Sequence, residues 1–267
     1  MSKARDSIED LKTIDANLAA KAPLASPVFT GNVGVGVTPE SDWASAFEVI
    51  QIGQAGVVWA NNNDNSTRLG MNVKYDGAYK RINSNKAANL TLDSAGSFVF
   101  DVAATGAADA AISWNTAMTI DNAGIVTKPL QPAFMGLSAT ATNLAIQSWH
   151  TIVFSSERFD NNNDFSSNTF TAPVTGKYQM NVFIRLHSID NGGHYYFINL
   201  NTSNSHYYHI HGANGWSADP DYHTIGSSYV IDMDAGDTAI VQLYQGGGSA
   251  QTDIQDNEGY FSGVLVA

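Results

Sequence analysis

The stretch "KYQMNVFIRLH", residues 177–187, alternates apolar and polar side chains along its whole length. The apolar positions are Tyr178, Met180, Val182, Ile184 and Leu186, and the polar ones include Lys177, Gln179, Asn181, Arg185 and His187. Side chains on a β-strand point alternately to opposite faces. The pattern therefore predicts an antiparallel strand with one face on a core and the other toward solvent.

Further strands are predicted downstream of this one. "YVIDMDAGDTAIVQLY" (229–244) indicates two strands around the turn Asp234-Ala235-Gly236-Asp237, and "GYFSGVLVA" (259–267) indicates a last strand. Several short strands separated by turns are typical of a β-sandwich or jelly roll. Upstream, Pro129 and Pro132 in "VTKPLQPAF" mark a domain boundary. We therefore expect a C-terminal domain at 131–267.

The first 22 residues are the one segment with a helical pattern. Leu11, Ile14 and Leu18 follow a 3–4 spacing, and Ser7 with Asp10 fits a capping box. Three apolar positions are too few to stabilise an isolated helix. A short helix at 1–22 is expected to pack against copies of itself or another protein, and a frayed tail is the alternative.

Residues 23–130 are expected to form a β-rich module. "RLGMNVKYDGAYKRI" (68–82) places Leu69, Met71, Val73 and Tyr75 on one face, before a hairpin turn at Asp76-Gly77. "LTLDSAGSFVF" (90–100) and "MTIDNAGIVTKP" (118–129) share the order apolar-Thr-apolar-Asp-Ser/Asn-Ala-Gly. Each predicts a strand that ends in a turn opened by Asp93 or Asp121.

Composition narrows the classes of function. From Gln131 onward the sequence has 3 basic and 12 acidic residues. Such an acidic surface repels nucleic acid and anionic lipid headgroups. The chain has no cysteine, which excludes disulfides and thiolate chemistry. No apolar run is long enough to cross a membrane, and "MSKARDSIEDLK" lacks the apolar core of a signal peptide. We expect synthesis and folding in a cytoplasm.

The C-terminal domain resembles C1q/TNF-like domains. "FTAPVTGKY" matches the family's F-x-x-P-x-x-G-x-Y pattern through Phe170, Pro173, Gly176 and Tyr178. Gly236 and Asp237 resemble its turn before the penultimate strand, and "YFSGVLVA" resembles its closing strand. The resemblance implies a C1q-like jelly-roll β-sandwich that assembles as a homotrimer. The collagen stalk of many relatives is absent, since no Gly-x-y repeat occurs.

The N-terminal half resembles phage tail fibres. "APLASPVFTGNVGVG" is similar to a recurrent linker of such fibres, and the region 22–134 is similar to a fibre shaft module. The combination implies a trimeric fibre in a virion tail: an attachment helix that binds other tail or baseplate proteins, a β-rich shaft, and a C1q-like head that binds a host surface glycan or protein. A structural spacer or adaptor fibre without a ligand is the alternative.

An enzyme is the third hypothesis. Fibre-borne depolymerases cut polysaccharide with paired carboxylates. The chain has only five glutamates: Glu9, Glu40, Glu48, Glu157 and Glu258. The aspartates Asp160, Asp164, Asp219 and Asp221 lie in loop-like sequence, where aspartate usually shapes turns. No serine elbow or phosphate-binding loop is present. We expect no enzymatic activity.

The expected receptor-binding residues lie in "HGANGWSADPDYH" (211–223), which is too polar and glycine-rich for a strand. The segment combines aromatic and polar side chains that suit glycan recognition: Trp216, Tyr222, Asp219, Asp221 and Asn214. A solvated loop with one anchoring tryptophan is the alternative.

The adjoining "HYYHIH" (206–211) is expected to be a strand. Tyr208 and Ile210 should face the core, while Tyr207, His209 and His211 extend the receptor surface outside it. His209 and His211 are weak candidates for a transition-metal site, and "DNNND" (160–164) offers oxygen ligands that suit Ca²⁺. The preferred prediction is a receptor surface without a cofactor.

Overall fold

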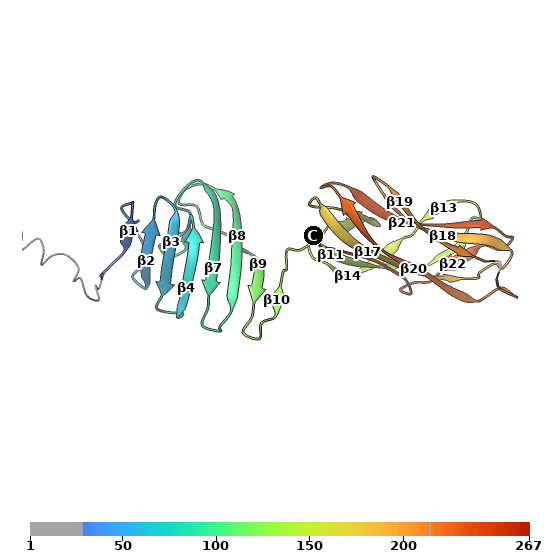
Figure 1. Ribbon diagram of the computed structural model, residues 1–267, viewed down its shortest axis with the longest axis horizontal. Coiled ribbons are helices and arrows are strands. Elements are labelled where there is room, and N and C mark those ends of the chain that lie inside the picture. The colour runs from blue at the N-terminus through green and yellow to red at the C-terminus, as the bar shows by residue number, and fades with distance from the viewer. Residues whose placement is uncertain (1–28, 214) are drawn as a thin grey trace, which may run out of the picture. The chain divides into compact units, whose positions relative to one another are not determined.

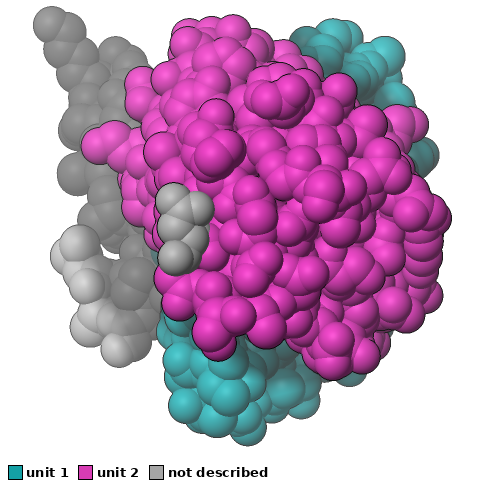
Figure 2. All heavy atoms as spheres, turned by 90° about the vertical axis from the view of Figure 1, so that its right-hand side faces the viewer, with its two compact units in different colours: residues 1–128 teal, residues 129–267 magenta. Residues whose placement is uncertain are grey.

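The computed structural model describes residues 29–213 and 215–267. The chain divides into two compact units between Lys128 and Pro129, and the sequence predicts this boundary after residue 130 (Figure 2). The helix expected at 1–22 lies outside the described residues. Within them the chain forms strands and turns only (Figure 1), and no membrane-spanning helix occurs among them.

The first unit is built on one eight-stranded sheet, in the order β1-β2-β3-β4-β7-β8-β9-β10. All neighbours are antiparallel except β1 and β2. The strands are β1 (Val33–Val35), β2 (Phe47–Ile52), β3 (Gly56–Asn61), β4 (Ser66–Met71), β7 (Asn85–Leu92), β8 (Phe98–Gly106), β9 (Asn115–Ile120) and β10 (Val126–Thr127).

The hairpin predicted at Asp76-Gly77 is confirmed, because β5 (Lys74–Tyr75) pairs with β6 (Tyr79–Lys80). The prediction that Leu69, Met71 and Val73 share one face is wrong. Leu69 and Met71 are exposed on β4, whereas Val73 is fully buried. Asn72, with φ of 61°, reverses the backbone between them and ends the alternation.

One face of this sheet is covered by the chain itself. Trp43, Phe47, Val49, Val57, Trp59 and Val73 form the core there, and Tyr75, Tyr79 and Trp114 pack against it. Stacked and edge-on rings connect the layer, with Phe47 4.7 Å from Tyr75 and Tyr75 5.0 Å from Tyr79. We call this side the covered face.

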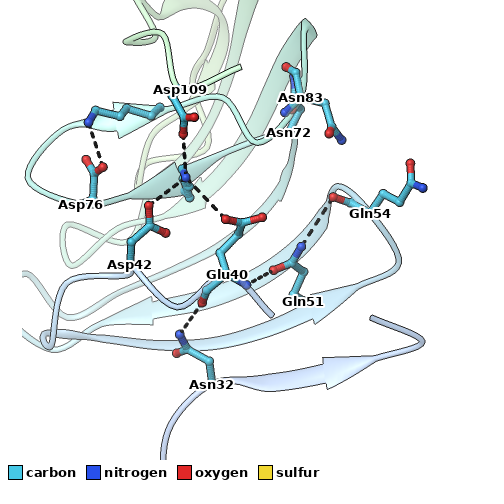
Figure 3. A network of polar contacts seen from close by, with 11 residues as sticks. Asn32, Glu40, Asp42, Gln51, Gln54, Asn72, Asp76, Asn83 and Asp109 are labelled. Atoms are coloured by element: carbon cyan, nitrogen blue, oxygen red, sulfur yellow. Dashed lines mark hydrogen bonds and ion pairs between the residues drawn. The ribbon is translucent and has the colours of Figure 1, made fainter. Parts of the chain in front are cut away.

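A buried lysine ties the covering loops together. The Lys74 ammonium lies 2.8 Å from Asp42, 2.8 Å from Asp109 and 3.4 Å from Glu40 (Figure 3). Burial lowers the pKa of Lys74, but hydrogen bonds to Asp109 and Asp42 and the nearby carboxylate charges outweigh it, so the pKa is raised. Two segments distant in sequence, at residues 40–42 and at Asp109, therefore converge on the Lys74 cation.

The two aspartate turns are confirmed. The Asp93 carboxylate accepts the N–H groups of Ala95 and Ser97, and the Asp121 carboxylate accepts those of Ala123 and Ile125. Gly96 and Gly124 follow with φ of 80° and 81°, which a side chain would disfavour. The same turn, opened by aspartate and closed by glycine, joins β7 to β8 and β9 to β10.

The second unit, the head, is a sandwich of two sheets. The larger sheet contains β12 (Ala141–Leu144), β22 (Thr252–Ile254), β17 (Gly176–His187), β23 (Tyr260–Leu265), β11 (Ala133–Ser138), β14 (Phe154–Asp160) and β20 (Tyr222–Met233). The smaller sheet contains β15 (Phe165–Ser166), β16 (Thr169–Thr171), β21 (Thr238–Gly247), β18 (Gly193–Thr202), β19 (His206–Gly212) and β13 (Trp149–Thr151).

The connections identify a jelly roll. The order β11-β23-β17-β20 in one sheet faces β16-β21-β18-β19 in the other, and the chain crosses between the sheets at eight of the twelve steps from β11 to β23. This double Greek-key path is the jelly-roll topology. The β-sandwich prediction is therefore confirmed, as are the turn at 234–237 and the last strand.

The core of the head confirms the alternation in β17. Tyr178, Met180, Val182, Ile184 and Leu186 are all buried. Phe134 stacks at 4.8 Å on both Phe165 and Phe170 and meets Phe261 edge-on at 4.9 Å. Phe170, and Phe261 in the last strand, are thus core residues.

The chain enters and leaves the head at the same end. The Gln131 amide donates to the Leu265 carbonyl at 2.6 Å, and the Leu265 N–H donates to the Pro132 carbonyl at 3.0 Å. The turns that follow β17, β19 and β21 lie at the opposite ends of their strands. These turns therefore form the end of the head that is remote from its termini.

Candidate functional site

An aromatic surface covers the outer side of the smaller sheet of the head. Tyr195 and Phe197 on β18 lie beside Tyr208 on β19, Tyr244 on β21 and Trp149 on β13, and we call these five residues the aromatic face. The strand register places Trp149 opposite Tyr244, Tyr244 opposite Phe197, and Phe197 opposite Ile210. One apolar row therefore crosses four strands.

The rings form a connected layer. Trp149 lies 5.0 Å from Tyr244, 5.9 Å from Phe197 and 6.0 Å from Tyr208 between ring centroids. Phe197 lies 4.8 Å from Tyr195 and 5.7 Å from Tyr208. Cross-strand aromatic contacts of this kind hold rings at fixed positions on the sheet. The aromatic face is therefore a preorganised platform.

This platform is open to solvent. Trp149, Tyr208 and the neighbouring Ile210 are 43%, 49% and 58% exposed. Scattered exposed apolar residues are ordinary, but a contiguous patch marks an interaction surface. The aromatic face is the candidate binding surface of the head.

Polar groups border the aromatic rings on the same side of the sheet. Asn199 pairs with Tyr208 and with Gln242, and its Nδ2 donates to Gln242 Oε1 at 3.1 Å. The same Nδ2 lies 3.2 Å from Nδ1 of His206, whose ring stacks on Tyr208 at 5.7 Å. Asn199 is buried beneath this border, while Gln242 is half-buried and His206 is exposed, so the latter two side chains are the ones available to ligand hydroxyls.

The predicted loop holds its tryptophan differently from the sequence-based expectation. Trp216 is half-buried and packs against the core of the head. Its ring lies 5.2 Å from His211 and 5.0 Å from His223. This position gives Trp216 an anchoring role between β19 and β20, which corresponds to the alternative that the sequence left open.

The two loop aspartates contact the neighbouring turn between β17 and β18. Asp219 Oδ1 accepts the Asn191 N–H at 2.9 Å, and the Asp221 carbonyl accepts the Ser188 N–H at 3.2 Å. Asn214 lies outside the described residues. The aspartates therefore brace one turn against another.

Tyr222 is the exposed aromatic residue at the end of this loop. It is 53% exposed, and the Arg185 guanidinium lies 4.3 Å from its ring centroid. Its ring meets His187 edge-on at 4.2 Å. Glu258 accepts from Arg185 at 2.9 Å and lies 3.0 Å from His187, so the charges of this cluster are already paired.

The facing predicted for "HYYHIH" is wrong. Tyr208 and Ile210 point outward, while Tyr207, His209 and His211 lie on the half-buried inner side. The reason is that β19 is the edge strand of the smaller sheet, and its inner side packs against β20 of the larger sheet. Tyr207 contacts Tyr229 at 5.4 Å and His211 contacts His223 at 4.1 Å, so partly polar side chains close the sandwich edge.

The loop proposed for Ca²⁺ makes protein contacts through Asp160, Asn161 and Asn162. Among residues 29–213 and 215–267, no group of three or more His, Asp or Glu side chains is placed to hold a metal. In "DNNND", the Asp160 carboxylate accepts the N–H groups of Asp164 at 3.1 Å and Phe165 at 2.9 Å. Asn161 and Asn162 donate to the carbonyls of Gln131 and Leu130, so the loop fastens the start of the head.

The sequence contained an incomplete signal for the aromatic face. "YYFINL" (195–200) is apolar on both faces, and periodicity alone does not say which side is buried. Trp149 and Tyr244 are distant in sequence, and only the β13–β21 register brings them together. A surface made from four strands becomes visible only when the sheet order is known.

Comparisons with known proteins found similar structures but no similar sequence. No family model and no curated protein matches the sequence. The structure is similar to the globular domain of a zebrafish complement 1qA protein, at 18% identity and a TM-score of 0.38, over 51% of this chain and 98% of that one. Murine APRIL at pH 8.0 is similar at 10% identity and a TM-score of 0.38, over 51% and 99%.

Proposed function

We propose that this protein is a phage tail-fibre component whose head binds a carbohydrate on the host surface. The aromatic face is the observation that carries the proposal. Trp149 and Tyr208 present exposed ring faces on a rigid sheet. Flat aromatic rings stack on the C–H groups of sugars, and an adjacent amide border binds their hydroxyls.

The charge of the head defines the class of sugar. With 12 acidic and 3 basic residues from Gln131 onward, the head disfavours sulfated, phosphorylated or sialylated chains. Neutral sugars and amino sugars carry no such penalty. We therefore propose a neutral or amino-sugar-containing surface polysaccharide as the ligand.

The fibre context rests on the sequence resemblance in residues 22–134 and on the division into two units. In this proposal the N-terminal segment attaches to other tail or baseplate proteins, the first unit forms a shaft, and the head is displayed as a homotrimer in the virion tail. Three heads would present three aromatic faces, so weak individual sites would add up to strong adsorption.

The test is glycan binding by the full-length protein. Neutral, amino-sugar and anionic bacterial polysaccharides are arrayed and probed with the wild type and with Trp149→Ala plus Tyr208→Ala. Loss of two stacking rings should weaken binding to a neutral ligand at least about tenfold. Phe159→Ala is the matched control, because Phe159 is 47% exposed on a strand of the other sheet.

Other outcomes identify the alternatives. Binding that survives the double substitution removes the aromatic face from the site. A protein that binds no arrayed glycan and does not block host adsorption would favour the structural spacer. Release of oligosaccharides would favour a depolymerase, although the named residues of the aromatic face and its polar border include no carboxylate pair for glycoside hydrolysis.

A further inference from the structure

The sheet of the first unit has a second, uncovered face. Strand register aligns Ile50, Val58, Leu69, Leu90, Phe100 and Met118 in one row across six strands. These residues alternate with the covered positions, for example Leu69 with the buried Gly70 and Ile50 with the buried Val49. We call the side that carries this row the open face.

Two parallel rows extend the open face on either side. One runs through Ile52, Met71 and Val102, and the other through Leu92, Phe98 and Ile120. Leu69 is 56% exposed, Met71 49% and Phe98 43%. Large apolar side chains thus point to solvent across most of the sheet.

The size of the open face is that of an interface. Six strands about 4.8 Å apart and three rows about 7 Å apart give a flat area of roughly 600 Å². That value is at the upper limit of the largest apolar patch on a typical monomer, about 300–600 Å². It approaches the roughly 800 Å² that each partner contributes to a standard stable interface.

The open face offers little to a charged partner. Among the residues aligned by register in its three rows, Glu48 at one end is the single charged one. Apolar side chains of this density are complementary to another apolar sheet face. A second copy of the chain supplies such a face, and symmetric packing brings equivalent rows together.

We propose that the open face packs against the open faces of other copies of this chain and forms the core of the shaft. In a threefold assembly, as the sequence predicts, three open faces enclose one axis. The proposal is independent of any ligand of the head. It also explains why the second side of this sheet is apolar although the chain itself covers only the first side.

The covered face makes the proposal testable without unfolding the unit. That side has its own core around Trp59 and the Lys74 ion pairs. Charges placed on the open face point away from both. Variants there should therefore lose association while they keep the covered layer.

The first experiment measures mass by light scattering or sedimentation at micromolar concentration. The full-length chain of 28.5 kDa is expected at two or more chain masses. Leu69→Glu plus Met71→Glu should lower the denaturant concentration at which the assembly dissociates, even where the heads also hold the chains together, because uncompensated charges would be buried. Asn62→Glu plus Asn63→Glu, which adds the same two charges in the exposed β3–β4 turn, should leave the association unchanged.

The second experiment guards against a variant that fails to fold. The chain has no cysteine, so Leu69→Cys and Asn63→Cys each introduce one thiol at the two positions. Maleimide should label Cys at position 63 at least about tenfold faster than at position 69, since burial blocks access to the thiol.

The outcomes separate the occupants of the open face. Slow labelling at 69 in an assembly supports the proposal. Equal labelling rates overturn it, because the open face is then uncovered or covered elsewhere. Slow labelling in a protein with a single chain's mass also overturns it, since the chain would then cover its own open face.

Discussion

The imidazole rings of His211 and His223 lie 4.1 Å apart on strands that belong to opposite sheets of the head. Trp216 contacts both rings, at 5.2 Å and 5.0 Å. The edge of the sandwich is therefore closed by two imidazole rings and an indole ring. Burial, and secondarily the neighbouring His211, lowers the pKa of His223 below its usual value of 6.5.

The head should lose stability on mild acidification. Because the pKa of His223 is lowered in the folded protein, the unfolded chain binds protons first as pH falls below about 6.5. The free energy of unfolding is therefore highest above that pH and decreases until the folded pKa is reached. Denaturant titrations between pH 8 and pH 5 should show this decrease.

Two substitutions test the assignment to this pair of residues. His223→Phe keeps an aromatic ring beside Trp216 and should flatten the pH dependence. His194→Gln changes an exposed histidine and should leave it intact. An unchanged pH profile in His223→Phe would show that another group causes the decrease.

Replacing Lys74 should destabilise the first unit. Lys74→Met leaves Asp42, Asp109 and Glu40 close together without their shared cation. The lysine is buried but its partners are partly exposed, so we expect a loss of about 2 kcal/mol in the free energy of unfolding.

Lys80→Met provides the matched control for this prediction. Lys80 makes a 2.8 Å ion pair with Asp76, but both side chains are more open than that of Lys74. Its loss should cost at most about 1 kcal/mol. Equal costs for the two lysines, measured by chemical denaturation, would contradict a special role for Lys74.

Asp190 should hold two remote turns of the head together. Its carboxylate accepts the N–H groups of Gly192 and Ala250, each at 2.7 Å, and that of Ser249. These bonds, led by that from Ala250, lower the pKa of Asp190. Asp190→Asn replaces one acceptor oxygen by a donor and should cost about 1–3 kcal/mol.

Amide exchange gives the sharper measurement for this prediction. The N–H groups of Ser249 and Ala250 should exchange faster in Asp190→Asn. Asp219→Asn is the control, because Asp219 accepts one 2.9 Å bond, from the Asn191 N–H. If both variants exchange alike at Ser249 and Ala250, Asp190 does not have this role.

Local patterns predicted the parts of the fold that depend on local physics. The alternation in β17 identified five buried residues because one side of that strand faces the core and the other side faces solvent. The turns at Asp93 and Asp121 followed from a side-chain acceptor and a glycine at fixed spacing. Each of these signals is complete within a dozen residues.

Features that depend on register were beyond the sequence. In "HYYHIH" both sides of the strand carry large side chains, so the position of the strand at the edge of the sandwich determines which side is buried. Asn72, with a positive φ, separated Met71 from Val73 without any break in the alternation. The aromatic face needed the pairing of β13 and β18 with β21. Long-range pairing, and not residue type, determines all three.

The last prediction separates the loop expected from the sequence from the aromatic face. Trp216 packs on His211 and His223, so Trp216→Ala should lower the stability of the head by about 1–3 kcal/mol. The native Trp149 side chain is 43% exposed, so Trp149→Ala should change the stability of the head by less than about 1 kcal/mol.

Host adsorption should respond in the opposite order. Under conditions where both proteins are folded, Trp149→Ala should reduce the ability of the purified protein to block phage adsorption, while Trp216→Ala should keep it. Tyr222→Ala, which removes an exposed ring at the end of the same loop, tests whether the loop contributes directly. The opposite result would be that Trp216→Ala and Tyr222→Ala abolish blocking in folded protein while Trp149→Ala does not. The receptor site would then be the loop at 211–223, because the ligand would have to contact the loop and not the sheet.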